Sequence, residues 1–125
     1  MSLKLKSSDI FHITQVGVTG EEKLEGVDEF LLNKPLSELR KLIEECDNWI
    51  SIDNFMPHFC WLIGKPGIVI FSQSDPLIFG HAENKNLLKD RKYLRSNQFG
   101  TWEEAEYNKE AFVEPERVLN ALLGE

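Results

Sequence analysis

The fold is decided by residues 49–71, which read WISIDNFMPHFCWLIGKPGIVIF. The runs 49–53 and 67–71 at its two ends are short and apolar, as buried strands are. Between them, Asn54 is a favourable helix cap, residues 55–63 suit a short helix, and a glycine follows as a stop signal. Two buried strands joined by a helix form a βαβ unit, so the strands are predicted to be parallel with helices on both faces.

Strand and helix patterns continue on the amino-terminal side of this unit. Residues 11–16 are rich in β-formers and run into Gly17, and residues 27–32 are either a strand or an extended connection. Pro35 suits the start of a helix, and apolar side chains recur at helical spacing through residues 36–46. These elements predict an α/β fold: a single Rossmann-like, three-layer domain over residues 1–125 with a mostly parallel sheet of about four to five strands.

The carboxyl-terminal side is predicted to contain a long loop and a final helix. Residues 72–91 are rich in Ser, Asn, Asp, Pro and Gly, and loops of about 20 residues in compact domains are often functional. A short strand is expected at 92–95, followed by an acidic segment, 102–111, with helical character. A terminal helix is predicted over residues 115–123, with Val118, Leu119 and Leu122 facing inward.

Composition narrows the class of protein. The chain has 125 residues, 42% of them hydrophobic and 28% charged, as in ordinary globular domains. The net charge of -7 argues against nucleic acid as a partner, because such binding depends on Lys and Arg. No apolar run approaches the about 20 residues of a transmembrane helix, so a cytoplasmic location is expected. Residues 1–8 are interpreted as a flexible or vector-derived leader.

No cofactor, metal site or catalytic residue is predicted from motifs. Cys46 and Cys60 lack the spacing of a metal site and are expected to be buried free thiols. Walker and GxGxxG loops and a Ser-His-Asp series are also missing from the chain.

Polar residues follow three of the predicted strands where each strand ends. In open α/β sheets, ligands bind outside the carboxyl ends of the strands. We therefore expect these polar groups to form one ligand-binding edge, and the helix after Asn54 to offer backbone N–H groups to an anion. The residues at the three strand ends are Gln15, Gly17, Asp53, Asn54, Ser72, Gln73 and Ser74.

Each ionisable residue among the candidate binding residues has a structural alternative to a role in ligand binding. The His58 imidazole either donates to a phosphate oxygen or packs against the sheet with a backbone partner. Asp53 either contacts a ligand or caps backbone N–H groups. Glu21 and Glu22 are either solvated loop carboxylates or acceptors for the two hydroxyls of a ribose.

The order of these motifs resembles a known family. It runs from Asp53 to His58, through a Gly-Lys-Pro turn at 64–66, to a strand that ends in Phe71 and the Ser-Asp-Pro loop 74–76. This order, over residues 49–80, is similar to the carboxyl-terminal half of family 9 glycosyltransferases, the heptosyltransferase-like enzymes of GT-B fold.

The resemblance implies a nucleotide-sugar donor as ligand. Asp53, Asn54 and His58 would line the diphosphate and sugar site, and Glu21 or Glu22 would reach the ribose. The three loop residues Ser72, Gln73 and Ser74 would lie nearby. In such enzymes the acceptor site and the catalytic base belong to an amino-terminal domain. The implied partners are therefore that half, or a second copy of the chain on the same face, and transfer is not expected from this chain alone.

An alternative function is a non-catalytic, Rossmann-like protein-interaction module that has lost nucleotide binding. Two features favour it. Phe55 stands where the family has glycine, and the segment 102–116 is acidic. Either feature could form a protein contact.

Overall fold

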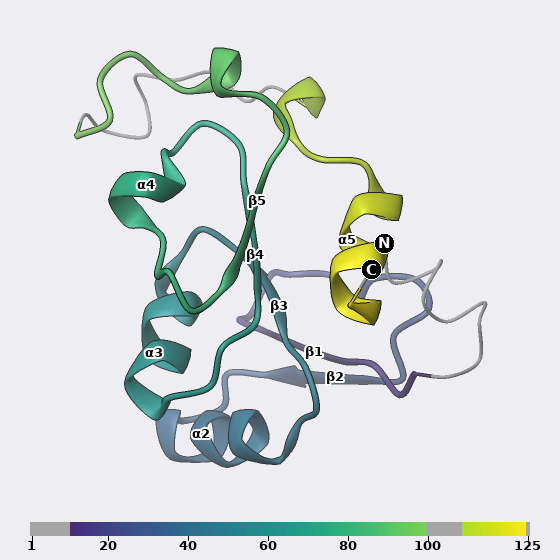
Figure 1. Ribbon diagram of the computed structural model, residues 1–125. Coiled ribbons are helices and arrows are strands. Elements are labelled where there is room, and N and C mark those ends of the chain that lie inside the picture. The colour runs from purple at the N-terminus through teal and green to yellow at the C-terminus, as the bar shows by residue number, and fades with distance from the viewer. Residues whose placement is uncertain (1–10, 100–108, 125) are drawn as a thin grey trace. The chain divides into compact units, whose positions relative to one another are not determined.

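The computed structural model describes residues 11–99 and 109–124 of the chain (Figure 1). The chain divides into two compact units, Met1–Leu42 and Ile43–Glu125. Within the described residues, no helix has both the length and the apolar character needed to span a bilayer.

The first unit contains a two-stranded parallel sheet. Strand β1, Thr14–Gly17, pairs with strand β2, Glu29–Leu32, and Thr14 lies opposite Glu29. The Asp28 carboxylate holds the residue before β1 in place, because it accepts a hydrogen bond of 2.7 Å from the Ile13 N–H. Both predicted strands are therefore present, in a sheet of their own.

Helix α2, Leu36–Glu45, follows the first sheet and spans the division between the units. The Pro35 carbonyl accepts hydrogen bonds from Glu38 N–H and Leu39 N–H at the start of the helix. Proline suits this position because the first-turn N–H has no partner within the helix. The structure thus confirms the helix predicted from the apolar spacing after Pro35.

The second unit is built on a three-stranded parallel sheet. Its strands are β3, Ile50–Ile52, β4, Ile68–Phe71, and β5, Lys85–Leu88, with β4 in the centre. Every residue of β4 is buried, as its unbroken apolar sequence predicts. β3 and β5 lie at the edges of this sheet and are only partly buried.

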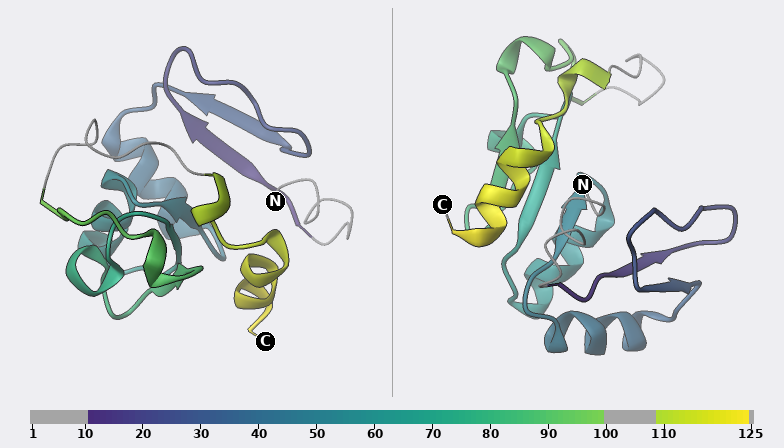
Figure 2. Two further views of the ribbon diagram at one scale, coloured as in Figure 1. Left: turned by 90° about the horizontal axis from the view of Figure 1, so that it is seen from above. Right: turned by 90° about the vertical axis from the view of Figure 1, so that its right-hand side faces the viewer.

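Helices cover both faces of the three-stranded sheet. Helix α3, Phe55–Ile63, and the single turn α4, Pro76–Phe79, lie on one side, and helix α5, Pro115–Leu123, lies on the other (Figures 1 and 2). Side chains alternate along a strand, so β4 sends Ile68 and Ile70 toward α5, where they pack with Val113 and Val118.

The turn before β4 is tightly packed against the start of β3. The Trp49 indole N–H donates to the Lys65 carbonyl over 3.0 Å. A Cβ atom on Gly67 would lie 2.2 Å from the Trp49 ring, so only glycine fits there. Cys60, on the inner face of α3, is fully buried, and burial raises the pKa of its thiol to about 11. Both cysteines are free, as predicted, although Cys46 is only partly buried.

The predicted single sheet of four to five strands is wrong. The strands within residues 11–99 and 109–124 form two parallel sheets, of two and three strands. The α/β class and the parallel pairing are confirmed, and the three-stranded unit is compatible with a Rossmann-like fold. The apolar pattern of a strand shows that it is buried, but not which strand it pairs with.

The predicted loop 72–91 also needs correction, because it contains α4 and β5. α4 is only one turn long, and its cap, Asp75, is a residue equally common in loops. β5 reads KNLL, which lacks a long apolar run because it is an edge strand. The strand expected at 92–95 is wrong, because a 3-10 turn, Arg91–Tyr93, occupies the start of this segment. The Asp90 side chain caps the turn by accepting a hydrogen bond from the Lys92 N–H.

The carboxyl-terminal region ends in a helix, and residues 1–10 and 100–108 lie outside the described part of the chain. The terminal helix is confirmed as α5, with Val118 buried and Leu122 packed against the core. Of the acidic segment 102–111, the structure describes only the 3-10 turn Lys109–Ala111. The predicted leader, residues 1–8, lies outside the described residues.

Candidate functional site

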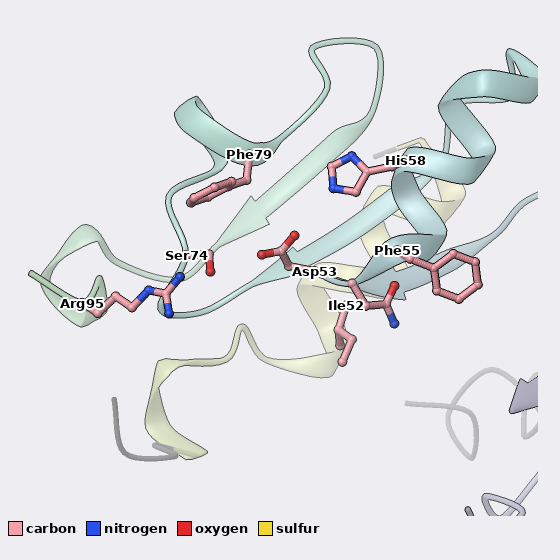
Figure 3. Close-up of a pocket in the computed structure, with 8 residues that line it drawn as sticks. Ile52, Asp53, Phe55, His58, Ser74, Phe79 and Arg95 are labelled. Atoms are coloured by element: carbon pink, nitrogen blue, oxygen red, sulfur yellow. The ribbon is translucent and has the colours of Figure 1, made fainter. Parts of the chain in front are cut away.

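A pocket of about 600 Å³ lies in the second unit at the carboxyl ends of β3 and β4 (Figure 3). This volume falls within the range of small-molecule sites. The lining combines two charged groups, polar groups and apolar side chains from segments that are distant in sequence. Its residues are Ile52, Asp53, Asn54, Phe55, His58, Ser74, Phe79 and Arg95.

Asn54 caps helix α3 beside the pocket. Its Oδ1 accepts hydrogen bonds from the Met56 N–H, at 2.9 Å, and from the Ser51 hydroxyl, at 3.1 Å. Pro57 has no N–H, so the first turn of α3 offers an anion fewer donors than most helices do. The cap predicted for Asn54 is therefore confirmed, and other groups must supply most of the attraction for a bound anion.

Asp53 is the acidic group of the pocket. Burial raises the pKa of its carboxyl, while the Ser74 hydroxyl and the nearby His58 and Arg95 side chains lower it. Figure 3 shows Asp53 between Ser74 and Arg95 on one side and His58 on the other. The environment therefore keeps a partly buried carboxylate close to two groups that can carry positive charge.

Ser74 places a buried hydroxyl at the same edge. The residue is only 2% exposed, and its Oγ lacks a partner with full hydrogen-bond geometry among the described residues. The hydroxyl is still near enough to the Asp53 carboxylate to lower its pKa. A buried hydroxyl without a strong partner is costly, and a bound ligand would relieve that cost.

Arg95 reaches the pocket from the segment after β5. The backbone holds it there, because Arg95 N–H donates to the Gln73 carbonyl over 3.0 Å. Gln98 forms two further hydrogen bonds with the loop after β4. Its Nε2 donates to the Gln73 carbonyl at 2.9 Å, and its Oε1 accepts from the Asp75 N–H at 2.7 Å. The loop after β4 and the segment 95–98 thus form one connected edge.

An ion pair between Asp75 and Arg91 also connects the loop after β4 to the segment after β5. The two side chains form a bidentate pair with N–O distances of 3.1 and 2.7 Å, and Asp75 Oδ1 also accepts from Leu77 N–H at 2.9 Å. Hydrogen bonds from Arg91 and from the Leu77 N–H lower the pKa of the Asp75 carboxyl. Neither residue lines the pocket, so the pair is structural.

His58 projects from α3 into the pocket and contacts a second histidine. Its Nδ1 lies 2.8 Å from Nε2 of His81, and the two rings meet edge to face. His81 in turn stacks on Trp61, with ring centroids 4.9 Å apart and an interplanar angle of 11°. His58 therefore lies in the lining of the pocket, and its partner is another imidazole rather than a backbone carbonyl. Its predicted role toward a phosphate stays a prediction.

The predicted residues after β4 are only partly in the pocket. Ser74 lines it, whereas Ser72 and Gln73 are not among the lining residues. Gln73 contributes through its backbone carbonyl, which anchors Arg95 and Gln98.

The predicted residues near β1 belong to the first unit. The Gln15 and Glu21 side chains form hydrogen bonds with nearby backbone. Gln15 bonds to the backbone of Glu22 and of Leu24. Glu21 Oε1 accepts a hydrogen bond of 3.1 Å from the Val18 N–H. The Gly17 carbonyl accepts from Asn33 N–H at 2.9 Å, and Glu22 is exposed. These contacts organise the loop after β1, and the role of Glu21 or Glu22 toward a ribose stays a prediction.

The basic group of the pocket, Arg95, is not predictable from a motif in the sequence. Arg95 lies in a segment that had been assigned to a strand, and its nearest motif in sequence is the 3-10 turn before it. Ile52 and Phe79 were also not predicted as lining residues. A positive charge shortly after the predicted loop 72–91 is only a weak signal for a pocket residue. The fold is what brings Arg95 near Asp53.

Comparison of the chain with protein-family models, curated proteins and solved structures found no match. The described residues also contain no group of three His, Cys, Asp or Glu side chains placed to hold a metal ion.

Proposed function

We propose that this protein binds the diphosphate and sugar of a nucleotide-sugar donor, as the donor-binding part of a glycosyltransferase. One observation carries the proposal: Asp53, Ser74 and Arg95 come from three separate segments and meet in one pocket at the carboxyl ends of β3 and β4. The order of motifs over residues 49–80, which resembles the donor half of family 9 glycosyltransferases, supports it.

The charges suggest how such a donor would lie. A diphosphate is drawn to the guanidinium of Arg95 and to a donor N–H on His58, and is repelled by the Asp53 carboxylate. Asp53 can only accept hydrogen bonds when ionised, so it suits the hydroxyls of a sugar. We therefore assign the phosphates to Arg95, His58 and the hydroxyl of Ser74, and the sugar to Asp53.

The apolar rim of the pocket supports a covering partner. Ile52 is 54% exposed and Phe55 is 56% exposed, although both line the pocket. Exposed apolar groups at a binding edge are typical of surfaces that a second domain or chain covers. In this proposal that partner supplies the acceptor site and the catalytic base, since no catalytic residue is assigned here.

Calorimetric titration with a panel of nucleoside diphosphates and nucleotide sugars tests the proposal. We expect saturable binding of at least one compound. Replacement Arg95→Gln should weaken it about tenfold or more, because hydrogen bonds to charged groups contribute about 1.5–3 kcal/mol. Arg95→Lys should retain part of the affinity.

The matched control is Arg40→Gln, which removes the same charge from an exposed position on α2. This variant should bind like the unaltered protein. Absence of binding with every compound, or equal affinities for Arg95→Gln and Arg40→Gln, would contradict the proposal. The alternative function, a non-catalytic interaction module, predicts the first of these outcomes.

A further inference from the structure

We infer that His81 is a positioning residue, which holds His58 in the tautomer that carries its proton on Nε2 and so presents an N–H donor to an anion in the pocket. The starting observation is the distance of 2.8 Å between His58 Nδ1 and His81 Nε2. The inference rests on the proposed function only for the identity of the anion.

The chemistry of two imidazoles limits the arrangements. A hydrogen bond between their nitrogens needs one N–H and one lone pair. If His81 Nε2 donates, His58 Nδ1 is the acceptor and a neutral His58 must carry its proton on Nε2. If His58 Nδ1 donates instead, a neutral His58 carries its proton on Nδ1. Its Nε2 then has a lone pair and can only accept a hydrogen bond.

Asp53 decides between these arrangements. His58 and Asp53 line the same pocket, and Figure 3 shows the His58 ring beside the Asp53 carboxylate. A lone pair on His58 Nε2 would face a region of negative potential, whereas an N–H there is stabilised by it. The pocket therefore favours donation from His81 to His58 and an N–H on His58 Nε2.

His81 is held firmly enough to perform this task. Its ring stacks on Trp61, and its backbone carbonyl accepts hydrogen bonds from Asn84 N–H at 3.0 Å and from Asn86 Nδ2 at 2.9 Å. The segment between α4 and β5 is thereby fixed at three points. A ring anchored in this way can orient a more exposed neighbour such as His58.

Two variants separate the hydrogen bond from the stacking. His81→Phe keeps an aromatic ring for Trp61 but removes the donor, whereas His81→Gln keeps an N–H donor but removes the ring. NMR of nitrogen-15-labelled histidine, at a pH where both imidazoles are neutral, reports the tautomer of His58 without any ligand. We expect His58 to carry its proton on Nε2 in the unaltered protein and in His81→Gln. In His81→Phe, Asp53 alone still favours that tautomer, so the share of His58 that carries its proton on Nδ1 should rise measurably.

Binding provides a second readout, with adenosine and uridine diphosphates as probes. We expect His81→Phe to weaken diphosphate binding about two- to threefold, in line with the share of His58 that loses its Nε2 proton, and His81→Gln to restore most of the affinity. A His58 proton on Nδ1 in the unaltered protein, or a tautomer unchanged in His81→Phe, overturns the inference. If the tautomer behaves as expected but no diphosphate binds to the unaltered protein, the proposed function is wrong and the positioning role of His81 stands.

Discussion

At the scale of single residues, Asp53 and Arg95 bring opposite charges to one pocket. Burial raises the pKa of the Asp53 carboxyl, and the Ser74 hydroxyl and the nearby His58 and Arg95 side chains oppose that rise. A bound phosphate would compete with Asp53 for Arg95, while sugar hydroxyls would satisfy Asp53. The free site thus contains one carboxylate and one guanidinium, and a ligand that carries both hydroxyls and phosphates would offer a partner to each.

Asn54 is the residue whose role in the fold can be tested most simply. Replacement Asn54→Ala should lower the free energy of unfolding by about 1 kcal/mol, because the Met56 N–H loses its acceptor at the start of α3. Asn54→Ser keeps a side-chain acceptor and should lose much less. Urea denaturation followed by circular dichroism measures both, and equal losses for the two variants would show that the cap is not the cause.

Residue-level predictions succeeded where the chemistry is local. The cap at Asn54 and the left-handed stop at Gly64 depend on nearby backbone, so the sequence was enough to predict both. Arg95 was not predicted, because the pocket residue that it lies near, Asp53, is 42 positions earlier in the chain. The contact between His81 and His58, which are 23 positions apart, was not predicted for the same reason. Contacts between residues this far apart in the chain depend on the three-dimensional fold.

At the scale of elements, the segment from β4 to Gln98 is built as one braced loop. Asp75 caps α4 and pairs with Arg91, while Gln98 hydrogen-bonds to the backbone of the loop after β4 at Gln73 and Asp75. The sequence predicted a loop here because α4 is a single turn and β5 has little apolar pattern. In contrast, α3 was predicted with its true ends, since it has a cap, an apolar face and a glycine stop.

The Asp75–Arg91 pair predicts how stability depends on pH. The pKa of Asp75 is lower in the folded state than in the unfolded chain, so the pair stabilises the fold fully above the unfolded value of about 3.9. That stabilisation is lost as the pH falls through the lower, folded value. Asp75→Asn removes the charge but keeps a capping oxygen, and should therefore be less stable than the unaltered protein at pH 7.

Chemical denaturation over a series of pH values measures this effect. We expect the difference in unfolding free energy between the unaltered protein and Asp75→Asn to shrink as the pH approaches 2. The control is Asp47→Asn, which alters an exposed carboxylate just after α2. A difference for Asp75→Asn that stays constant with pH would mean that the ion pair does not stabilise the fold.

At the scale of the whole molecule, the pocket is formed entirely within the second unit. All its lining residues lie between Ile52 and Arg95, and the core behind it is made by β4 and α5. The composition and the strand and helix periodicity were enough to predict an α/β fold with parallel strands. They could not predict two separate sheets, because pairing partners are chosen by three-dimensional packing rather than by the pattern within a strand.

The most direct test of the proposed site is to map binding onto the backbone. Nitrogen-15-labelled protein is titrated with nucleoside diphosphates and nucleotide sugars, and the amide chemical shifts are followed by NMR. We predict saturable shifts concentrated at Asp53, Phe55, His58, Ser74 and Arg95. An absence of shifts with every compound, or saturable shifts confined to residues outside this pocket, would contradict the central claim.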